Sequence, residues 1–207
     1  PSPTERGASD AGVHPAAVGG EGRQQRIRDM FAGIAPRYEL VNRVASAGLD
    51  ASWRRRVVQA LDLAPGEWCL DACCGTGDLA RALAAGGVRV VAADFCRPML
   101  DVASRAAAPG AAWLEADARR LPLRDDSVSA ACVAFGLRNV VPPEEGLHEM
   151  VRVVRPGGRV AVLEFGEPPH PIVRRLYHLY SRRVLPLLGD AISGRWGTYR
   201  YLPQTIG

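Results

Sequence analysis

The residues with the clearest chemical potential form one short segment, residues 71–78, with the sequence DACCGTGD. An apolar run (residues 68–70) precedes this segment, and a helix-like run (residues 79–85) follows it. Gly75 and Gly77 carry no Cβ, so the backbone can turn sharply there and a ligand can lie directly against it. A strand that ends in an acid, a turn of small residues and a helix start together predict a nucleotide-type binding site.

A second acid, Asp94, comes seventeen residues after Gly77 and ends another apolar run, residues 88–93. A carboxylate at that place can accept hydrogen bonds from both hydroxyls of a ribose. The turn lacks the GxGxxG pattern of dinucleotide sites, and Asp71 and Asp78 flank it. Two carboxylates would repel a pyrophosphate, whereas they suit a sulfonium and an ammonium group. We therefore favour S-adenosylmethionine over NAD as the ligand, with an ordinary strand-to-helix turn as the alternative.

A third polar feature, Asp117-Ala118, follows a third predicted strand, residues 112–115. The carboxylate of Asp117 can accept the exocyclic amine of an adenine, and the backbone N–H of Ala118 can reach a ring nitrogen. The alternative is a solvated acid in a surface loop. The cofactor contacts that we expect are Asp71, Gly75, Thr76, Gly77, Asp94, Phe95, Asp117 and Ala118.

The pair Arg138-Asn139 follows a fourth apolar run, residues 128–135, and these two polar residues stand between apolar neighbours. Strand ends at the same edge of a parallel sheet line the ligand site. The sequence therefore favours Arg138 and Asn139 as active-site residues. The alternative is a helix-capping asparagine beside a solvated arginine.

The composition limits the class of protein. The chain has 207 residues and a net charge of +4, with 26 basic residues that are scattered rather than grouped, so nucleic acid is not an expected partner. No apolar run approaches the ~18 residues of a membrane span, and no secretory signal is visible. Five cysteines are typical of reduced thiols in a cytoplasmic protein. Cys73-Cys74 has no second cysteine pair or nearby histidine, so we expect no metal.

The elements that position these residues alternate along the chain. We expect a disordered tail over residues 1–22, helices over 23–62, a cofactor-binding core over 63–167, and helices with a tail over 168–207. Within the core, strands are predicted over residues 68–71, 89–94, 112–115, 128–135 and 159–165, and helices over 78–85, 98–107 and 143–154. This alternation predicts a single α/β domain with a doubly wound, mainly parallel, Rossmann-like sheet.

Several blocks of the sequence resemble the ubiquinone/menaquinone biosynthesis C-methyltransferase family. They are YELVN at 38–42, the glycine turn at 71–79, FGLRN at 135–139, RVVRPGGR at 152–159, LEF at 163–165 and YRYLP at 199–203. The glycine turn is generic to class I methyltransferases, whereas FGLRN, LEF and YRYLP together are far more specific. The resemblance covers residues 25–206. The fold that it implies closes with two further antiparallel strands, which we expect to be missing from the 207 residues.

The resemblance implies methyl transfer from S-adenosylmethionine to a ring carbon of a polyprenyl quinol, either demethylmenaquinol or the methoxy-benzoquinol precursor of ubiquinone. It implies substrate contacts at Tyr38, Asn42, Arg138, Tyr199 and Tyr201, and it places Ala134 where some members carry a cofactor-contacting serine. Arg138 stays protonated, so it would hold a phenolate, while Asn139 would anchor a second oxygen. His178 is a candidate base, although an exposed or core histidine is the commoner situation.

The resemblance also implies partners. Residues 23–62 and 172–188 would form a lid over an apolar pocket for the prenyl tail, and their arginines would contact anionic lipid at the inner face of the cell membrane. A homodimer is compatible with this arrangement. Two alternatives stay open: a methyltransferase of the same fold that acts on a soluble natural product, and a non-catalytic adenosylmethionine-binding assembly protein.

Overall fold

The computed structural model of the protein describes residues 20–180. Tyr199 and Tyr201, nearly all of the tail predicted over residues 1–22, and any strand beyond residue 180 lie outside the described residues. Within them, the core is a sheet of five parallel strands in the order β3-β2-β1-β4-β5. The strands are β1 (Trp68–Ala72), β2 (Arg89–Asp94), β3 (Ala111–Glu115), β4 (Val128–Ala134) and β5 (Val154–Leu163).

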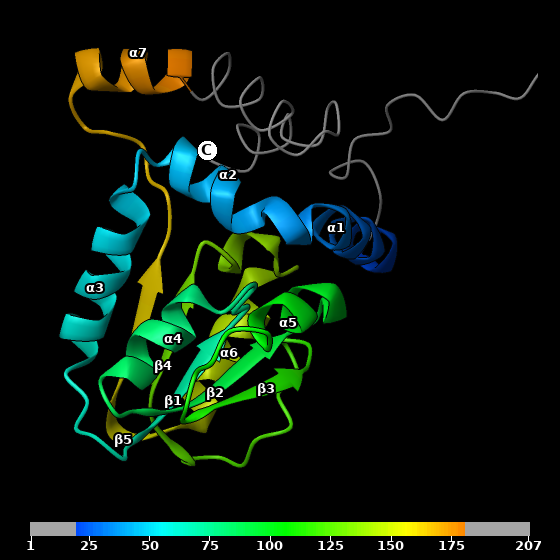
Figure 1. Ribbon diagram of the computed structural model, residues 1–207, viewed down its shortest axis with the longest axis vertical. Coiled ribbons are helices and arrows are strands. Elements are labelled where there is room, and N and C mark those ends of the chain that lie inside the picture. The colour runs from blue at the N-terminus through cyan, green and yellow to red at the C-terminus, as the bar shows by residue number, and fades with distance from the viewer. Residues whose placement is uncertain (1–19, 181–207) are drawn as a thin grey trace, which may run out of the picture.

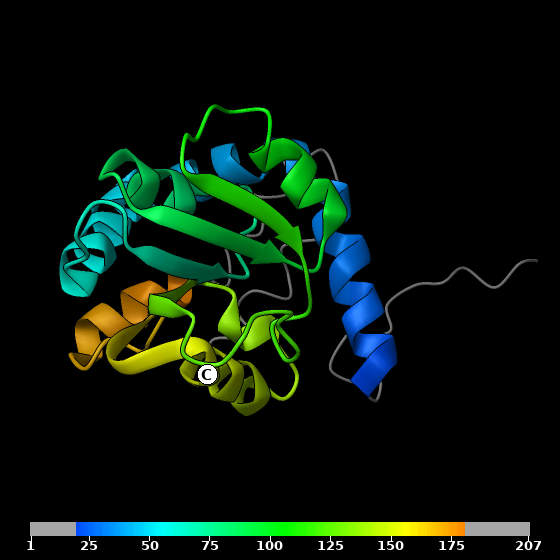
Figure 2. The ribbon, with the colours of Figure 1, turned by 90° about the horizontal axis from the view of Figure 1, so that it is seen from below.

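Helices cover both faces of the sheet, which confirms the predicted doubly wound fold. Figure 2 separates the layers, with α4 and α5 on one side of the sheet and α6 on the other. The helices are α1 (Gly20–Ile34), α2 (Tyr38–Ala45), α3 (Leu49–Leu61), α4 (Asp78–Ala85), α5 (Arg97–Ala103), α6 (Pro143–Val153) and α7 (Pro171–Leu179), with short 3₁₀ turns η2 (Ala35–Arg37) and η3 (Leu137–Asn139). None of these helices is long and apolar enough to cross a membrane.

The alternation of side chains along β1 explains why both faces are apolar. Cys69 packs with Leu61 of α3 and Leu83 of α4, whereas Leu70 packs with Met150 of α6. Successive side chains of a strand point to opposite faces, so Asp71 must share the face of Cys69. The sequence therefore directs this carboxylate into the buried layer under α3 and α4.

The start of the last strand differs from the prediction. The sequence RPGG predicted a break between a helix and a strand at residue 159, but α6 ends at Val153 and β5 begins at Val154. The pairing of β4 with β5 shifts register between Val128 and Ala130, so the glycines form an irregular part of the strand. A Cβ on Gly158 would lie 2.5 Å from the Ser129 carbonyl oxygen. Glycine serves close strand packing here rather than a turn.

One helix end was also predicted imperfectly. The helix predicted to reach residue 107 ends at Ala103, and the Ser104 hydroxyl then donates a hydrogen bond to the Asp101 carbonyl oxygen. The helical stretch predicted after Pro171 is α7 up to Leu179, and its expected continuation lies beyond the described residues. The helices predicted over residues 23–62 are α1, α2 and α3, and Figure 1 shows α1 and α2 lying across the edge where the strands end.

Candidate active site

The turn after β1 is built from left-handed backbone. Cys73, Gly75 and Gly77 have φ of +53°, +56° and +87°. A Cβ on Gly77 would lie 2.5 Å from the ring of Trp113 on β3, so only glycine fits at this position. Gly77 also precedes the first residue of α4. The turn is therefore held close to the sheet, with its backbone directed toward the edge where the strands end.

Asp94 joins this turn to the end of β2. Its Oδ2 accepts a hydrogen bond of 2.8 Å from the Gly75 N–H, and its Oδ1 accepts one of 2.8 Å from the Cys96 N–H. Burial raises the pKa of Asp94, while these backbone donors oppose that shift. A carboxylate oxygen can accept two hydrogen bonds, so each oxygen retains capacity for a ribose hydroxyl.

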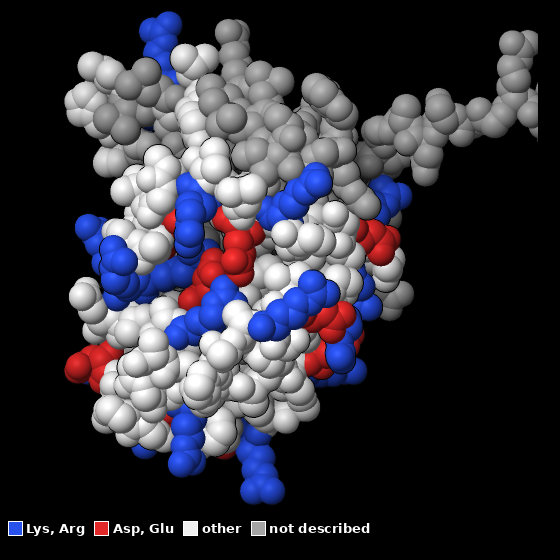
Figure 3. Space-filling view, in the orientation of Figure 1, with Lys and Arg blue, Asp and Glu red and all other residues white. Residues whose placement is uncertain are grey.

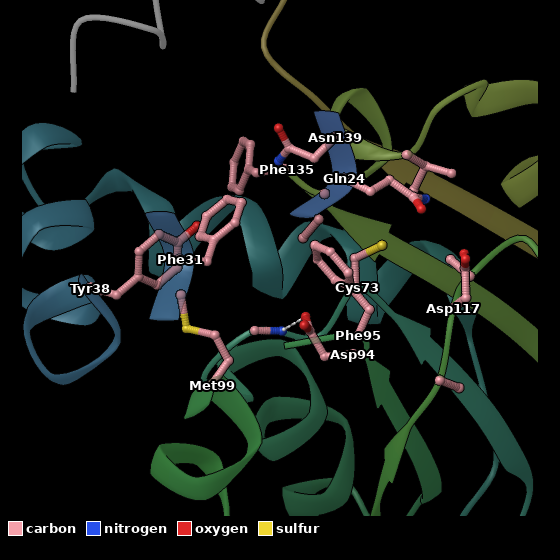
Figure 4. Close-up of a pocket in the computed structure, with 16 residues that line it drawn as sticks. Gln24, Phe31, Tyr38, Cys73, Asp94, Phe95, Met99, Asp117, Phe135 and Asn139 are labelled. Atoms are coloured by element: carbon pink, nitrogen blue, oxygen red, sulfur yellow. Dashed lines mark hydrogen bonds between the residues drawn. The ribbon is translucent and has the colours of Figure 1, made fainter. Parts of the chain in front are cut away.

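A pocket opens above Asp94, between the strand ends and the helices α1 and α2. Figure 4 shows Phe31 and Tyr38 on one side of it, Asp117 on the opposite side and Asp94 between them. Its lining combines aromatic rings with a few polar groups, as ligand sites commonly do. The lining residues are Gln24, Phe31, Tyr38, Cys73, Gly75, Asp94, Phe95, Met99, Ala116, Asp117, Ala118, Ala134, Phe135, Gly136, Asn139 and Val140.

Most of the residues predicted from the sequence come together here. Gly75, Asp94, Phe95, Asp117, Ala118, Ala134, Tyr38 and Asn139 all line the pocket. Asp71 and Thr76 line a smaller adjoining hollow, together with Arg54 and Asp78. Gly77 supports the turn from behind, and Asn42 and Arg138 are not among the lining residues of either space.

The carboxylate of Asp117 is held by its neighbour Arg119. The Arg119 Nη2 donates to Asp117 Oδ2 at 2.7 Å, and the same guanidinium bonds Gln24 Oε1 at 2.9 Å. These donors lower the pKa of Asp117, so it stays ionised at neutral pH. The contact also ties α1 to the loop after β3. An ionised acid beside the small Ala118 suits the edge of an adenine.

Asp71 is the least satisfied acid of the site. It is 1% exposed, and its Oδ2 has no hydrogen-bond partner within residues 20–180. Burial raises its pKa to about 7; Asp94 and Asp78 add to that rise, and Arg54 opposes it. A buried carboxylate without a partner is costly, and a cationic ligand group would offset that cost. The ammonium group of S-adenosylmethionine fits this requirement, and the Asp94 carboxylate fits the ribose.

Ion pairs connect α2 and α3 to the start of α4. Arg54 on α3 contacts Asp50 and lies 3.3 Å from Asp78 Oδ2. Arg81 on α4 lies 2.7 Å from Glu39 Oε1 on α2. Both arginines therefore link the helices above the strand ends to the glycine turn.

Two polar side chains that the sequence singled out lie elsewhere. The Arg138 guanidinium lies 5.3 Å from the centroid of the Phe165 ring, and its Nη1 is 3.5 Å from Glu164 Oε2. His178 Nε2 lies 3.0 Å from Glu167 Oε1. Both groups are directed toward acids that follow β5 rather than into the pocket.

Sequence reasoning missed several lining residues. Gln24 and Phe31 belong to a helix that was expected only as a lid, and Phe31 was assigned to its apolar face. Met99 lies on α5 with no polar group to mark it. Phe135 was noticed only as part of a motif. Its non-glycine φ of +59° at a strand end is a structural signal that the sequence does not contain.

Comparison with known proteins shows which family the chain resembles. The profile of the ubiE/COQ5 methyltransferase family matches residues 20–207. A demethylmenaquinone methyltransferase of Thermus thermophilus is 50% identical over 183 residues, which cover 86% of this chain and 83% of that protein. A ubiquinone/menaquinone biosynthesis C-methyltransferase of Geotalea daltonii is 40% identical over 190 residues, covering 88% of this chain and 80% of that protein.

Solved structures show the same fold at low identity. The [4+2]-cyclase SpnF superposes with a TM-score of 0.61 at 20% identity, covering 71% of this chain and 62% of that one. A SAM-dependent methyltransferase from Aquifex aeolicus has a TM-score of 0.55 at 20% identity, covering 64% of this chain and 75% of that one. The protein is a methyltransferase whose cofactor is S-adenosyl-L-methionine. By the extent of the profile match and the identity to its relatives, the chain belongs to the ubiE/COQ5 methyltransferase family.

Proposed function

We propose that this enzyme methylates a ring carbon of a polyprenyl quinol, with demethylmenaquinol as the first candidate and the methoxy-benzoquinol precursor of ubiquinone as the second. The observation that carries the proposal is the 50% identity to a demethylmenaquinone methyltransferase over 86% of the chain. The aromatic lining of the pocket, Phe31, Tyr38 and Phe135, supports it because flat rings favour a flat acceptor.

The residues of the pocket and of its adjoining hollow have distinct roles in this proposal. When bound, S-adenosylmethionine supplies an electrophilic methyl group on a sulfonium. Asp94 would bind the ribose, Asp117 and Ala118 the adenine, and Asp71 the ammonium. Asn139 at the pocket wall would anchor an acceptor oxygen. The helices α1 and α2 would exclude water, and the main catalytic contribution of the chain would be to align the two reactants.

The test is a methylation assay on the full chain. The enzyme is incubated with S-adenosylmethionine and chemically reduced demethylmenaquinone in detergent, and the product is identified by mass spectrometry. We expect one added methyl on the prenylated naphthoquinol and faster turnover than with the methoxy-benzoquinol. Turnover only on a soluble acceptor without a prenyl tail would contradict the proposal. Cofactor binding without turnover on any quinol would favour the non-catalytic alternative.

We also propose that the helices at the strand ends meet a membrane surface, where a prenylated quinol resides. Leu40 and Val44 on α2 are 54% and 42% exposed, and Leu49 opens α3 beside them with 54% exposure. Basic side chains gather on the side of the molecule where α3 lies (Figure 3), and α3 carries the exposed Arg55 and Arg56. Apolar side chains flanked by arginines suit an interface with anionic lipid.

Vesicle sedimentation tests this surface. The double variant Leu40→Ser/Val44→Ser should bind anionic phosphatidylglycerol vesicles at least about tenfold more weakly, because each buried apolar side chain contributes about 1.5–3 kcal/mol. The matched control is Val151→Ser, which changes an exposed apolar residue of α6 on the other face of the sheet. Equal loss in both variants would contradict a surface centred on α2, and so would unchanged binding of the double variant.

A further inference from the structure

A largely buried ion pair lies beside the cofactor pocket. Glu164 directly follows β5 and Arg138 lies in η3; their side chains are 22% and 13% exposed. Arg138 Nη1 is 3.5 Å from Glu164 Oε2, and the guanidinium packs on the ring of Phe165. The pair therefore combines an acid and a guanidinium, two groups that can together receive a hydroxyl and its proton.

Much of the hydrogen-bonding capacity of this pair is not used, although Glu164 Oε2 accepts a hydrogen bond of 3.3 Å from the Phe165 N–H. Glu164 Oε1 and the Nε and Nη1 of Arg138 are buried and have no hydrogen-bond partner within residues 20–180. Leaving such a polar group unsatisfied costs about 1–3 kcal/mol, and more when the group is charged. A phenolic hydroxyl meets both needs, since its oxygen accepts from the guanidinium while its proton is donated to Glu164 Oε1.

Aromatic rings next to the pair form a flat wall. Phe135 and Phe165 stack with their centroids 4.5 Å apart, and Trp53 of α3 meets each of them edge-on at 6.0 Å. Phe135 also lines the cofactor pocket. Its φ of +59° is costly for a residue with a side chain, by about 1–2 kcal/mol. The fold holds this ring where the pocket and the ion pair adjoin.

Glu164 lies within electrostatic reach of the cofactor pocket. The pKa of Cys73, which lines that pocket, is raised first by burial and then by the charges of Asp94, Asp71, Asp117 and Glu164. Cys73 in turn packs on the turn after β4, because a Cβ on Gly136 would lie 2.4 Å from the Cys73 Cβ. A ring held at Glu164 would therefore border the space where the methyl donor binds.

We propose that Glu164 is the catalytic base that removes the hydroxyl proton of the quinol, and that Arg138 holds the phenolate that results. The inference rests on the proposed function, since it needs a phenolic acceptor. It also explains how Arg138 can act in the reaction. A guanidinium keeps its own proton and cannot be the base, so a neighbouring group must accept the proton of the hydroxyl, and Glu164 is that group. Phe165, which is 38% exposed, is the outer wall that an entering ring would displace.

The reaction balances with one proton released. The O–H bond of the quinol breaks, its proton moves to Glu164 Oε1, and the electron pair stays on the oxygen beside Arg138. The adjacent ring carbon then forms a bond to the methyl carbon as the methyl–sulfur bond breaks, leaving the electron pair on sulfur. The ring carbon loses its hydrogen to water as Glu164 returns a proton to the oxygen, which restores the aromatic quinol.

The first test is Glu164→Gln, which keeps the shape and removes the base. A positioned base typically contributes 10²–10⁴-fold, so we expect kcat to fall by about 10²–10³-fold with an unchanged dissociation constant for S-adenosylmethionine. The wild-type kcat/KM should fall at low pH, and that acidic limb should disappear in the variant. Within the described residues, Arg138 and Cys73 are ionisable groups near Glu164, and Tyr177 of α7 lies near Arg138; Tyr177→Phe should therefore keep the limb. The matched control is Glu144→Gln, an exposed acid in the first turn of α6.

A second measurement needs no turnover. The absorption of 1-naphthol changes when its ring leaves water, so a difference spectrum measures its dissociation constant without cofactor. A hydrogen bond to a charged acceptor raises affinity about tenfold or more, so Glu164→Gln should bind naphthol at least about tenfold more weakly than the wild type and Glu144→Gln. Arg138→Lys, which keeps the charge but loses the planar fork, should also bind naphthol more weakly.

The outcomes separate this inference from the proposed function. A Glu164→Gln enzyme that keeps kcat within threefold of the wild type, with its acidic limb intact, would overturn the role of Glu164 even if quinol turnover is established. If no quinol is methylated by the wild type, the proposed function fails and the naphthol affinities decide alone. Affinity lost in Glu164→Gln and kept in Glu144→Gln would then support the contact between Glu164 and a phenolic hydroxyl, and equal affinity in the two variants would overturn it.

Discussion

Replacing Asp94 by alanine is expected to weaken the binding of S-adenosylmethionine by at least about a hundredfold. Hydrogen bonds to a charged group contribute about 1.5–3 kcal/mol each, and the carboxylate would receive two from the ribose. The same change removes the acceptor of the Gly75 N–H and of the Cys96 N–H. Titration calorimetry with S-adenosylhomocysteine, the demethylated product, measures the effect directly.

Two further variants show whether the effect is local. Asp94→Asn keeps the shape but has only one accepting oxygen, so its affinity should lie between those of the wild type and Asp94→Ala. Asp101→Ala removes an exposed acid of α5 that pairs with Arg97, and its affinity should equal that of the wild type. An Asp94→Ala protein that is folded by circular dichroism and binds the product normally would show that the ribose lies elsewhere.

The positions of the residues expected to bind the cofactor could be predicted from the sequence, because they depend on the course of the backbone. Gly75 follows β1 and Asp94 ends β2, and parallel strands bring such ends to one edge whatever the rest of the chain does. The contact between them is a 2.8 Å hydrogen bond from the Gly75 N–H. The parallel, doubly wound sheet followed from the same alternation, since consecutive βα units have a fixed hand.

The part of the site that would bind the methyl acceptor could not be predicted in the same way, because its geometry depends on the direction of side chains. Arg138 follows β4 as expected, yet packing on Phe165 turns it away from the pocket toward Glu164. That orientation depends on two segments more than twenty residues apart in the sequence. The start of β5 was predicted wrongly for a related reason. The sequence around Gly158 is typical of a turn, but glycine is needed there because the neighbouring strand packs closely against it.

The second large effect concerns pH and Asp71. Its pKa is raised from 3.8 to about 7 in the folded protein. Below pH 3.8 the acid is protonated in both the folded and the unfolded chain; between there and pH 7 only the unfolded chain has lost the proton. The stability contributed by the protonated form is therefore fully present below the unfolded pKa and is lost as pH rises toward 7. A shift of about three pH units corresponds to about 4 kcal/mol in the free energy of unfolding.

Asp71→Asn should remove this dependence, because an amide does not titrate. Relative to the wild type, we expect the variant to gain stability from pH 4 to pH 7, by up to about 4 kcal/mol at pH 7 and above. Urea unfolding at several pH values measures the gain, and Asp101→Asn, a change at an exposed acid, is the matched control. A variant whose stability relative to the wild type stays constant over that range would contradict the raised pKa.

The same variant should lose affinity for S-adenosylmethionine. An ammonium group beside Asp71 Oδ2 favours the ionised acid, so binding to the wild type should release a proton near pH 7. Calorimetry in buffers of different ionisation enthalpy counts that proton, and Asp71→Asn should release none from this position. Asp71 Oδ2, which is buried without a hydrogen-bond partner within residues 20–180, would thus destabilise the fold and bind a cation. If Asp71→Asn is more stable but binds S-adenosylmethionine more weakly, the result would support both effects of Asp71. If the variant is more stable and binds with full affinity, the ammonium group lies away from Asp71.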